Sequence, residues 1–257
     1  MLFSEFPQAG RPVVVLLHGG GLSDWSLAPL RRRLEDRFCV LTPVLDGHGA
    51  DAGTTFRSIE ACAQKLLAFI DEACGGQVFA LGGLSLGAQV VVEVLSRRPD
   101  AARFALLESA LCLPIPGVRV LAKPTYALCY GLVRRRRFAR AQAKTLCLPP
   151  EMFEDYFADS KKMSRASLIN ITVANGSYRA ERGLAKTAAK TLLIVGEKER
   201  GIMRRSAELL RRTIPGSTLY AAPKKRHGEL SLCCPDEYAA LFLRFCGEAQ
   251  NAPDARL

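Results

Sequence analysis

The sequence lacks the features that place a chain in a membrane or in a secretory pathway. No apolar run is long enough to span a bilayer, and Met1–Pro7 shows no charged-then-apolar signal pattern. The nine cysteines are odd in number and scattered, and their spacing matches no metal site. We therefore expect free, mostly buried thiols in a cytoplasmic protein, and no metal centre.

Acidic residues are scarce relative to basic ones. Lysine and arginine total 36 against 25 aspartates and glutamates, so the net charge is +11. The basic residues form separate clusters, at 31–33, 134–137, 204–212 and 224–226, without a nucleic-acid-binding motif. This dispersion favours solvated helix faces, and we do not expect nucleic acid as a partner. The alternative is weak attraction to an anionic membrane surface. It fits Arg134–Arg137 best, because they directly follow the apolar stretch Val118–Val133.

Strand-like and helix-like segments alternate through most of the 257 residues. Short apolar, β-branched runs such as 13–17 and 191–195 are separated by longer amphipathic stretches such as 55–74. This alternation predicts an α/β fold with a mostly parallel central sheet flanked by helices. Loops that follow parallel strands meet at one edge of such a sheet, where ligands bind.

Residues 112–190 interrupt the alternation. Five prolines break this segment: Pro114, Pro116, Pro124, Pro149 and Pro150. The helix-like stretches between the breaks are 126–143, 151–160 and 164–174. We expect the segment to form a helical cap or lid, inserted into a core made of residues 1–111 and 191–257. Its apolar residues favour a substrate with an acyl or aromatic part.

The most specific pattern is Gly-x-Ser-x-Gly at 83–87, with Ser85 at its centre. A short apolar run ends just before it, and a longer one, 86–95, follows. This order predicts a strand, a sharp turn and a helix. Such a turn exposes the serine hydroxyl, and the helix amides favour negative charge beside it. We predict that Ser85 is a catalytic nucleophile.

Only three histidines are present: His18, His48 and His227. In sites built on this kind of turn, the order along the chain is nucleophile, acid, base. His18 and His48 precede Ser85, so His227 is the predicted general base.

The acid that orients the base should follow a strand between Ser85 and His227. Our first choice is Glu199, which lies three residues past the glycine that ends a buried strand. Glu197 is the second choice. Glu108 ends an apolar run on an earlier strand and is the alternative acid.

A glycine loop, His18-Gly19-Gly20-Gly21, follows the first strand-like run. Acyl transfer produces an oxyanion, which needs backbone N–H donors that are already in place. We expect the amides of Gly20 and Leu86 to supply them. His18, Gly19 and Gly21 support the loop.

In these motifs and their order the chain resembles the α/β-hydrolases. The matching segments are His18–Gly21, Asp46–Gly49, Gly83–Gly87, Gly196–Glu199 and His227. The resemblance implies serine hydrolase chemistry on esters, thioesters or amides, with no metal or organic cofactor. It also implies that His48, in a Gly-His-Gly loop, is structural. Two features depart from the family. The acid is a glutamate where aspartate is commoner, and the short amino terminus, where Leu2–Phe6 supply one strand, lacks the outermost hairpin of the sheet.

We therefore predict that the chain hydrolyses a carboxylic ester or thioester through a Ser85–Glu199–His227 triad and a covalent acyl-enzyme. Two alternatives stay open. The same triad supports carbon–carbon bond hydrolysis or a lyase step, and a chain without turnover would bind a ligand or a membrane surface.

Overall fold

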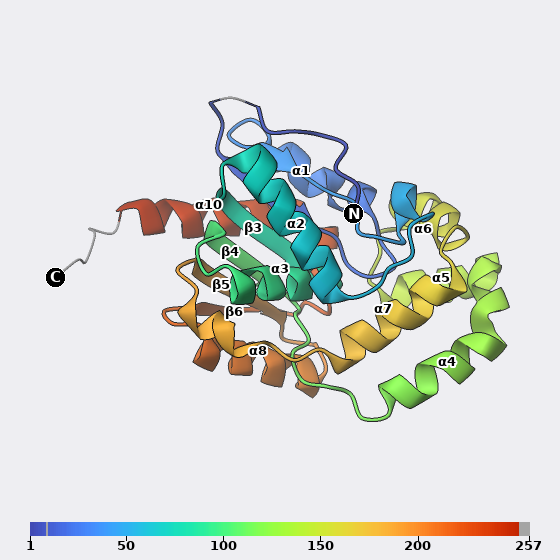
Figure 1. Cartoon of the computed structure of the whole chain (residues 1–257). Coiled ribbons are helices and arrows are strands. Elements are labelled where there is room, and N and C mark those ends of the chain that lie inside the picture. Colours follow the sequence, from blue (N-terminus) through green and yellow to red (C-terminus); the bar gives the residue numbers. More distant parts are fainter. Residues whose placement is uncertain (9, 252–257) are drawn as a thin grey trace.

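Runs of β-branched and other apolar residues form a six-stranded sheet at the centre of the computed structural model, which describes residues 1–8 and 10–251 (Figure 1). Every pair of neighbouring strands is parallel, in the order β2-β1-β3-β4-β5-β6. The strands are β1 (Val13–Leu17), β2 (Cys39–Leu41), β3 (Val78–Leu84), β4 (Ala102–Glu108), β5 (Lys190–Gly196) and β6 (Thr218–Ala222). The predicted α/β fold with a parallel sheet is confirmed.

Helices cover both faces of the sheet. Side chains alternate between the faces along each strand, so neighbouring residues of β1 belong to different cores. Val15 and Leu17 pack with residues of α2, α3 and α8, whereas Val14 and Leu16 pack with residues of α1 and α10 on the other face. These helices are α1 (Ala28–Leu34), α2 (Ile59–Cys74), α3 (Leu86–Arg97), α8 (Gly201–Thr213) and α10 (Pro235–Asn251), and the short α9 (Glu229–Cys233) packs with α1 and α10 through Leu230. Two 3-10 turns, η1 (Asp24–Leu27) and η2 (Gly49–Asp51), lie in the connections.

A run of helices connects β4 to β5, and we call residues 112–189 the helical insertion. It lies to one side of the sheet, with α4 as its outermost helix (Figure 1). Its elements are α4 (Val118–Cys129), η3 (Tyr130–Arg134), α5 (Arg136–Thr145), η4 (Pro150–Met152), α6 (Phe153–Ser160), α7 (Arg165–Ser177) and η5 (Arg182–Lys186).

The helix boundaries inside the insertion differ from the prediction. A continuous helix over 126–143 was wrong, because the chain tightens into η3 and Arg135 then adopts an extended conformation before α5 begins. Pro124 was expected to break the chain but lies within α4. Its ring leaves the carbonyl of Val120 without a helical partner. Val120 is exposed to solvent, which satisfies that carbonyl at little cost.

The amino-terminal segment does not add a strand to the sheet. Leu2 makes only an antiparallel bridge to Val44, so the prediction of a strand over Leu2–Phe6 was wrong. Phe3 instead stacks on Phe69 of α2, which directs the segment across that helix rather than along the sheet.

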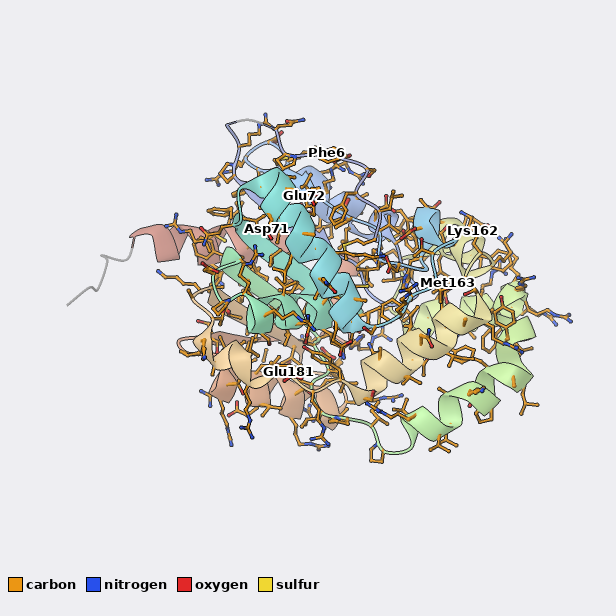
Figure 2. The ribbon with its side chains drawn as sticks, viewed as in Figure 1. Phe6, Asp71, Glu72, Lys162, Met163 and Glu181 are labelled. Atoms are coloured by element: carbon orange, nitrogen blue, oxygen red, sulfur yellow. The ribbon has the colours of Figure 1, made fainter. Side chains whose placement is uncertain are left out.

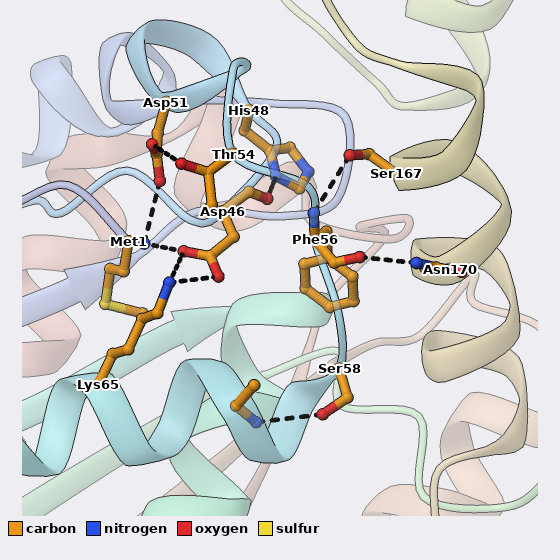
Figure 3. A network of polar contacts seen from close by, with 11 residues as sticks. Met1, Asp46, His48, Asp51, Thr54, Phe56, Ser58, Lys65, Ser167 and Asn170 are labelled. Carbon is orange, nitrogen blue, oxygen red and sulfur yellow. Dashed lines mark hydrogen bonds and ion pairs between the residues drawn. The ribbon is translucent and has the colours of Figure 1, made fainter.

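An ion-pair network fixes this segment to the core (Figure 3). The amino group of Met1 pairs with the carboxylates of Asp46 and Asp51, and Lys65 of α2 also binds Asp46. Its two aspartates lie in the loop before α2, and in the same loop Ser167 and Asn170 of α7 bind the backbone of Phe56. These contacts tie the helical insertion to the core.

The described residues include no helix that is both long and apolar enough to cross a membrane. All nine cysteines are free, and five of them are buried.

Candidate active site

Ser85 lies on the sharp turn between β3 and α3. Its backbone has φ 53° and ψ −109°, a strained conformation for a residue with a side chain. Glycines two residues before and after make the turn possible. A Cβ atom on Gly83 would lie 2.5 Å from the amide nitrogen of Ala88, and one on Gly87 would lie 2.4 Å from the carbonyl oxygen of Leu17. The Gly-x-Ser-x-Gly pattern is therefore a steric requirement of this turn.

The same turn places backbone donors beside the serine. The amide of Ser85 itself donates to the carbonyl of Glu108 on β4, at 2.8 Å. Leu86 is the first residue of α3, so its amide has no partner within the helix and lies at the positive end of the helix dipole. Gly20 is its neighbour, because a Cβ atom there would lie 3.5 Å from the Leu86 side chain. The two residues predicted as oxyanion donors thus come together next to Ser85.

His227 joins the serine to a carboxylate. Its Nε2 lies 3.0 Å from the Ser85 Oγ, and its Nδ1 lies 2.8 Å from the Glu199 Oε2. Because a carboxylate only accepts hydrogen bonds, Nδ1 carries the proton and Nε2 is free to accept from the serine hydroxyl. The chain therefore runs serine to imidazole to carboxylate, in the geometry that activates a serine.

Glu199 is held from several directions. It is 5% exposed, and its Oε1 accepts from the Ser109 hydroxyl at 2.7 Å and from the Gly196 amide at 2.9 Å. Burial alone would raise the pKa of this carboxyl, but its hydrogen bonds with His227, Gly196 and Ser109 hold the pKa below the ordinary value. The group is therefore a carboxylate at neutral pH. Gly196 also lets the loop of His227 approach, since a Cβ atom there would lie 2.4 Å from the Lys225 carbonyl.

Ser109 is a site residue that the sequence analysis missed. Besides its bond to Glu199, its hydroxyl accepts from the Gly228 amide at 3.4 Å, next to His227. Its backbone φ of 56° turns the chain sharply at the end of β4. The available signal was its position, because a hydroxyl residue directly after a strand lies at the edge of the sheet where the other candidate residues meet.

The other two candidate acids do not contact the histidine ring. Glu197 is exposed, and its Oε2 accepts from the Lys224 amide. Glu108 is 2% exposed and points into the core. Its Oε1 accepts from the Ser231 amide at 3.3 Å, and its Oε2 has no partner among the described residues. Burial raises the pKa of Glu108 to about 7.

The two earlier histidines are buried and neutral. His18 donates from Nδ1 to the Gly19 carbonyl at 2.9 Å and accepts at Nε2 from the Leu45 amide at 3.1 Å. His48 donates from Nδ1 to the Asp46 carbonyl at 2.9 Å. Burial lowers the pKa of His18 to about 3 and that of His48 to about 4. Both rings hold loops in place and lie outside the chain that contains Ser85.

A cavity of about 440 Å³ opens above Ser85. Its floor contains Gly20, Gly21 and Ser85, and the helical insertion supplies the walls. Apolar side chains dominate one part of the wall: Ile115, Val118, Val133, Leu146, Met163, Leu168 and Ile171. The polar side chains partly satisfy one another, since Tyr126 binds Thr172 at 3.1 Å and Tyr156 binds Gln142 at 3.2 Å. No residue that lines this cavity is charged.

One known protein family and several solved structures are similar to this chain. A family model described as the alpha/beta hydrolase family matches residues 14–241. A thermophilic esterase from Thermogutta terrifontis is similar in structure, with a TM-score of 0.76 and 20% identity over 96% of this chain and 93% of that chain. MenH from S. aureus has a TM-score of 0.79 and 19% identity over 97% and 98% of the two chains. An esterase from Exiguobacterium antarcticum has a TM-score of 0.76 and 17% identity over 93% and 92%. A search of curated proteins finds no match.

The buried Glu108 predicts a specific pH effect on stability. Its pKa rises from 4.5 to about 7 on folding, so between these pH values the folded protein keeps a proton that the unfolded chain releases. Stability from this group is therefore present below pH 4.5 and lost as the pH rises through 7. The parent should lose this stability on going from pH 4.5 to pH 8, whereas Glu108→Gln should not. We therefore expect the free energy of unfolding of Glu108→Gln, relative to that of the parent, to rise by about 3 kcal/mol over this pH range. Urea unfolding of both proteins at both pH values measures this, and a difference that does not change with pH would contradict it.

Proposed function

Because the chain belongs to the alpha/beta hydrolase family, and is therefore a hydrolase, we propose that it cleaves a carboxylic ester or thioester through a covalent acyl-enzyme. Ser85 is the nucleophile, His227 the general base and Glu199 the acid that orients it. The observation that carries the proposal is the continuous hydrogen-bonded chain from Glu199 through His227 to Ser85, at the floor of an apolar cavity.

Acylation follows from the positions of these groups. The Ser85 Oγ attacks the carbonyl carbon of the substrate, and the Nε2 of His227 takes the hydroxyl proton. The tetrahedral intermediate carries a negative oxygen, which the amides of Gly20 and Leu86 bind. Collapse of the intermediate breaks the bond to the leaving group, and His227 returns the proton to the departing alcohol or thiol. The acyl group is then bonded to Ser85.

Deacylation repeats these steps with water. His227 takes a proton from the water as the water oxygen attacks the acyl carbon. The bond between the acyl carbon and the Ser85 Oγ then breaks, His227 returns the proton to Oγ, and the carboxylic acid leaves. The carboxylate of Glu199 stabilises the imidazolium in both halves of the reaction. The bonds from Ser109 and the Gly196 amide keep that carboxylate ionised and fixed in direction.

The cavity supports a neutral substrate with an apolar acyl or aromatic part. An uncharged lining offers no counter-ion, and moving an unpaired charge out of water costs several kcal/mol. In this proposal residues 112–190 act as a cap over a core of residues 1–111 and 191–257. The cap determines which acyl group fits, because it supplies most of the cavity wall.

Two other functions are less well supported. A carbon–carbon hydrolase or a lyase of the same fold would use the same three residues, and the similarity to MenH belongs to the fold alone. Anionic substrates for such a step would meet no cation in the cavity. A binding protein without turnover has no need of an ionised Glu199, a correctly protonated His227 and a strained Ser85 in one chain.

Substitution of the three residues tests the proposed roles. We expect Ser85→Ala and His227→Ala to lower kcat/KM for a p-nitrophenyl ester by about 10⁴- to 10⁶-fold, and Glu199→Gln by about 10³- to 10⁴-fold. Glu197→Gln is the matched control, because it makes the same chemical change two residues away on an exposed side chain. Comparable losses in Glu197→Gln and Glu199→Gln would contradict the role of Glu199. Full activity in Ser85→Ala would exclude Ser85 as the nucleophile.

A matched pair of substrates tests the uncharged cavity. We expect p-nitrophenyl hexanoate to be hydrolysed at least about 100-fold more efficiently than the adipate mono-ester, which carries a carboxylate at the end of a six-carbon acyl chain. The measurement is kcat/KM for each ester with the parent protein. Equal or better hydrolysis of the anionic ester would show that the cavity accepts charge, and would favour the alternative reactions.

A further inference from the structure

The outer surface of α4 and η3 exposes an unusual number of apolar side chains. Of the eight large apolar residues that are exposed in the described part of the chain, four lie in α4 and η3. Three of them form the centre of the group: Val120 is 75% exposed, Leu121 61% and Leu128 86%. Exposed apolar side chains that gather on one surface mark an interaction site.

Helical periodicity collects these side chains on one face. Val120, Pro124 and Leu128 are spaced four residues apart, and Leu121 lies three residues before Pro124, so the four residues share the outer face of α4. The opposite face is apolar as well, but it belongs to the cavity, which Val118 and Tyr126 line. α4 is therefore the wall between the cavity and the surroundings, and it is the outermost helix of the insertion (Figure 1).

The charged residues in this stretch of the sequence are all cations. Residues 109–150 contain eight lysines and arginines and no aspartate or glutamate. By helical periodicity Arg119 and Lys123 lie together along one edge of the outer face. Their side chains are exposed and make no ion pair or hydrogen bond with any described residue. Arg135 and Arg137 at the end of the turn are likewise exposed and without a side-chain partner in the described structure.

We propose that the outer face of α4 and η3 docks on an anionic lipid surface. The apolar side chains enter the boundary between head groups and acyl chains, and the surrounding cations bind head-group phosphates. Charge complementarity favours this partner over a second copy of the chain, because two copies would bring the exposed Arg119 and Lys123 of each chain, which have no side-chain partner among the described residues, together across the contact.

Docking in this way would bring the cavity close to the lipid. Val118 and Tyr126 on the inner face of the docked helix line the cavity above Ser85. The role of docking in bringing lipid to Ser85 rests on the proposed ester hydrolysis. The binding itself does not, and Ser85→Ala should bind vesicles as the parent does.

Co-sedimentation with vesicles tests the docking surface. We expect the full chain to bind vesicles of 70% phosphatidylcholine and 30% phosphatidylglycerol at low salt, and to lose binding at high salt or on pure phosphatidylcholine. Arg119→Gln with Lys123→Gln should weaken partitioning by about 30-fold, since each cation near an anionic surface strengthens it by about fivefold. Leu128→Gln should weaken it by about tenfold or more.

Matched controls separate this surface from general stickiness and charge. Phe6 is 68% exposed and lies on the side of α2, away from Lys162 and Met163 of the insertion (Figure 2). Phe6→Gln and the pair Arg32→Gln with Arg37→Gln should each change partitioning by less than about twofold. These two arginines are exposed and have no side-chain partner among the described residues.

Several results would overturn the proposal. They are an absence of binding to anionic vesicles at low salt, equal binding to neutral vesicles, or equal losses in the control variants. Sedimentation velocity tests whether a second copy of the chain occupies this surface instead. A dimer that Leu128→Gln dissociates would make this face an interface between copies and would overturn the proposal. Hydrolysis of a soluble ester is measured alongside. A parent protein that hydrolyses the soluble ester but does not bind anionic vesicles would contradict the docking surface alone. A parent protein that binds the vesicles but does not hydrolyse the ester would contradict the proposed reaction alone.

Discussion

The crossing of β3 and α3 at Ser85 is the constraint on which the rest of the structure depends. A strand can turn directly into a helix only if no side chain stands where the two backbones pass, and Gly83 and Gly87 meet that condition with contacts that leave no room for a Cβ atom. The strained backbone of Ser85 is held because its amide bonds to β4 and because α3 packs into the main core. As a result the hydroxyl projects from the carboxyl edge of a parallel sheet, at the positive end of a helix. Every other candidate residue can act only if it is correctly placed relative to the Ser85 hydroxyl.

Buried hydrogen bonds hold the loops that surround the serine in place. Neutral His18 bridges the glycine loop and the loop after β2, while Glu199 is anchored by Ser109 and by the Gly196 amide before it contacts His227. Glu108 lies below the turn with its carboxyl turned into the core. Two glutamates at the ends of neighbouring strands thus have opposite environments. One carboxyl is stabilised as an anion by hydrogen bonds, and the other is favoured in its neutral form by burial.

The sequence contained most of the information that locates this site. Chain order alone separated His227 from His18 and His48, and the strand–turn–helix context separated Ser85 from other serines. Local patterns failed where tertiary contacts decide. Ser109 has no motif, because its role comes from Glu199 in the loop after the neighbouring strand. The sequence predicted a strand over Leu2–Phe6, but Phe3 stacks on Phe69 of α2, a contact that local patterns do not reveal. In the insertion, periodicity could not distinguish the face of α4 that lines the cavity from the face that is exposed, because both are apolar.

In the proposed reaction Ser85 attacks the substrate and is covalently modified. Reaction of the parent protein with a fluorophosphonate, followed by peptide mass spectrometry, tests this directly, because the reagent leaves a stable adduct on an activated serine. We expect one phosphonyl group per chain, on the peptide that contains Ser85, and no adduct in Ser85→Ala. An adduct of equal yield in Ser85→Ala, or ester hydrolysis by a parent protein that leaves Ser85 unmodified, would contradict it.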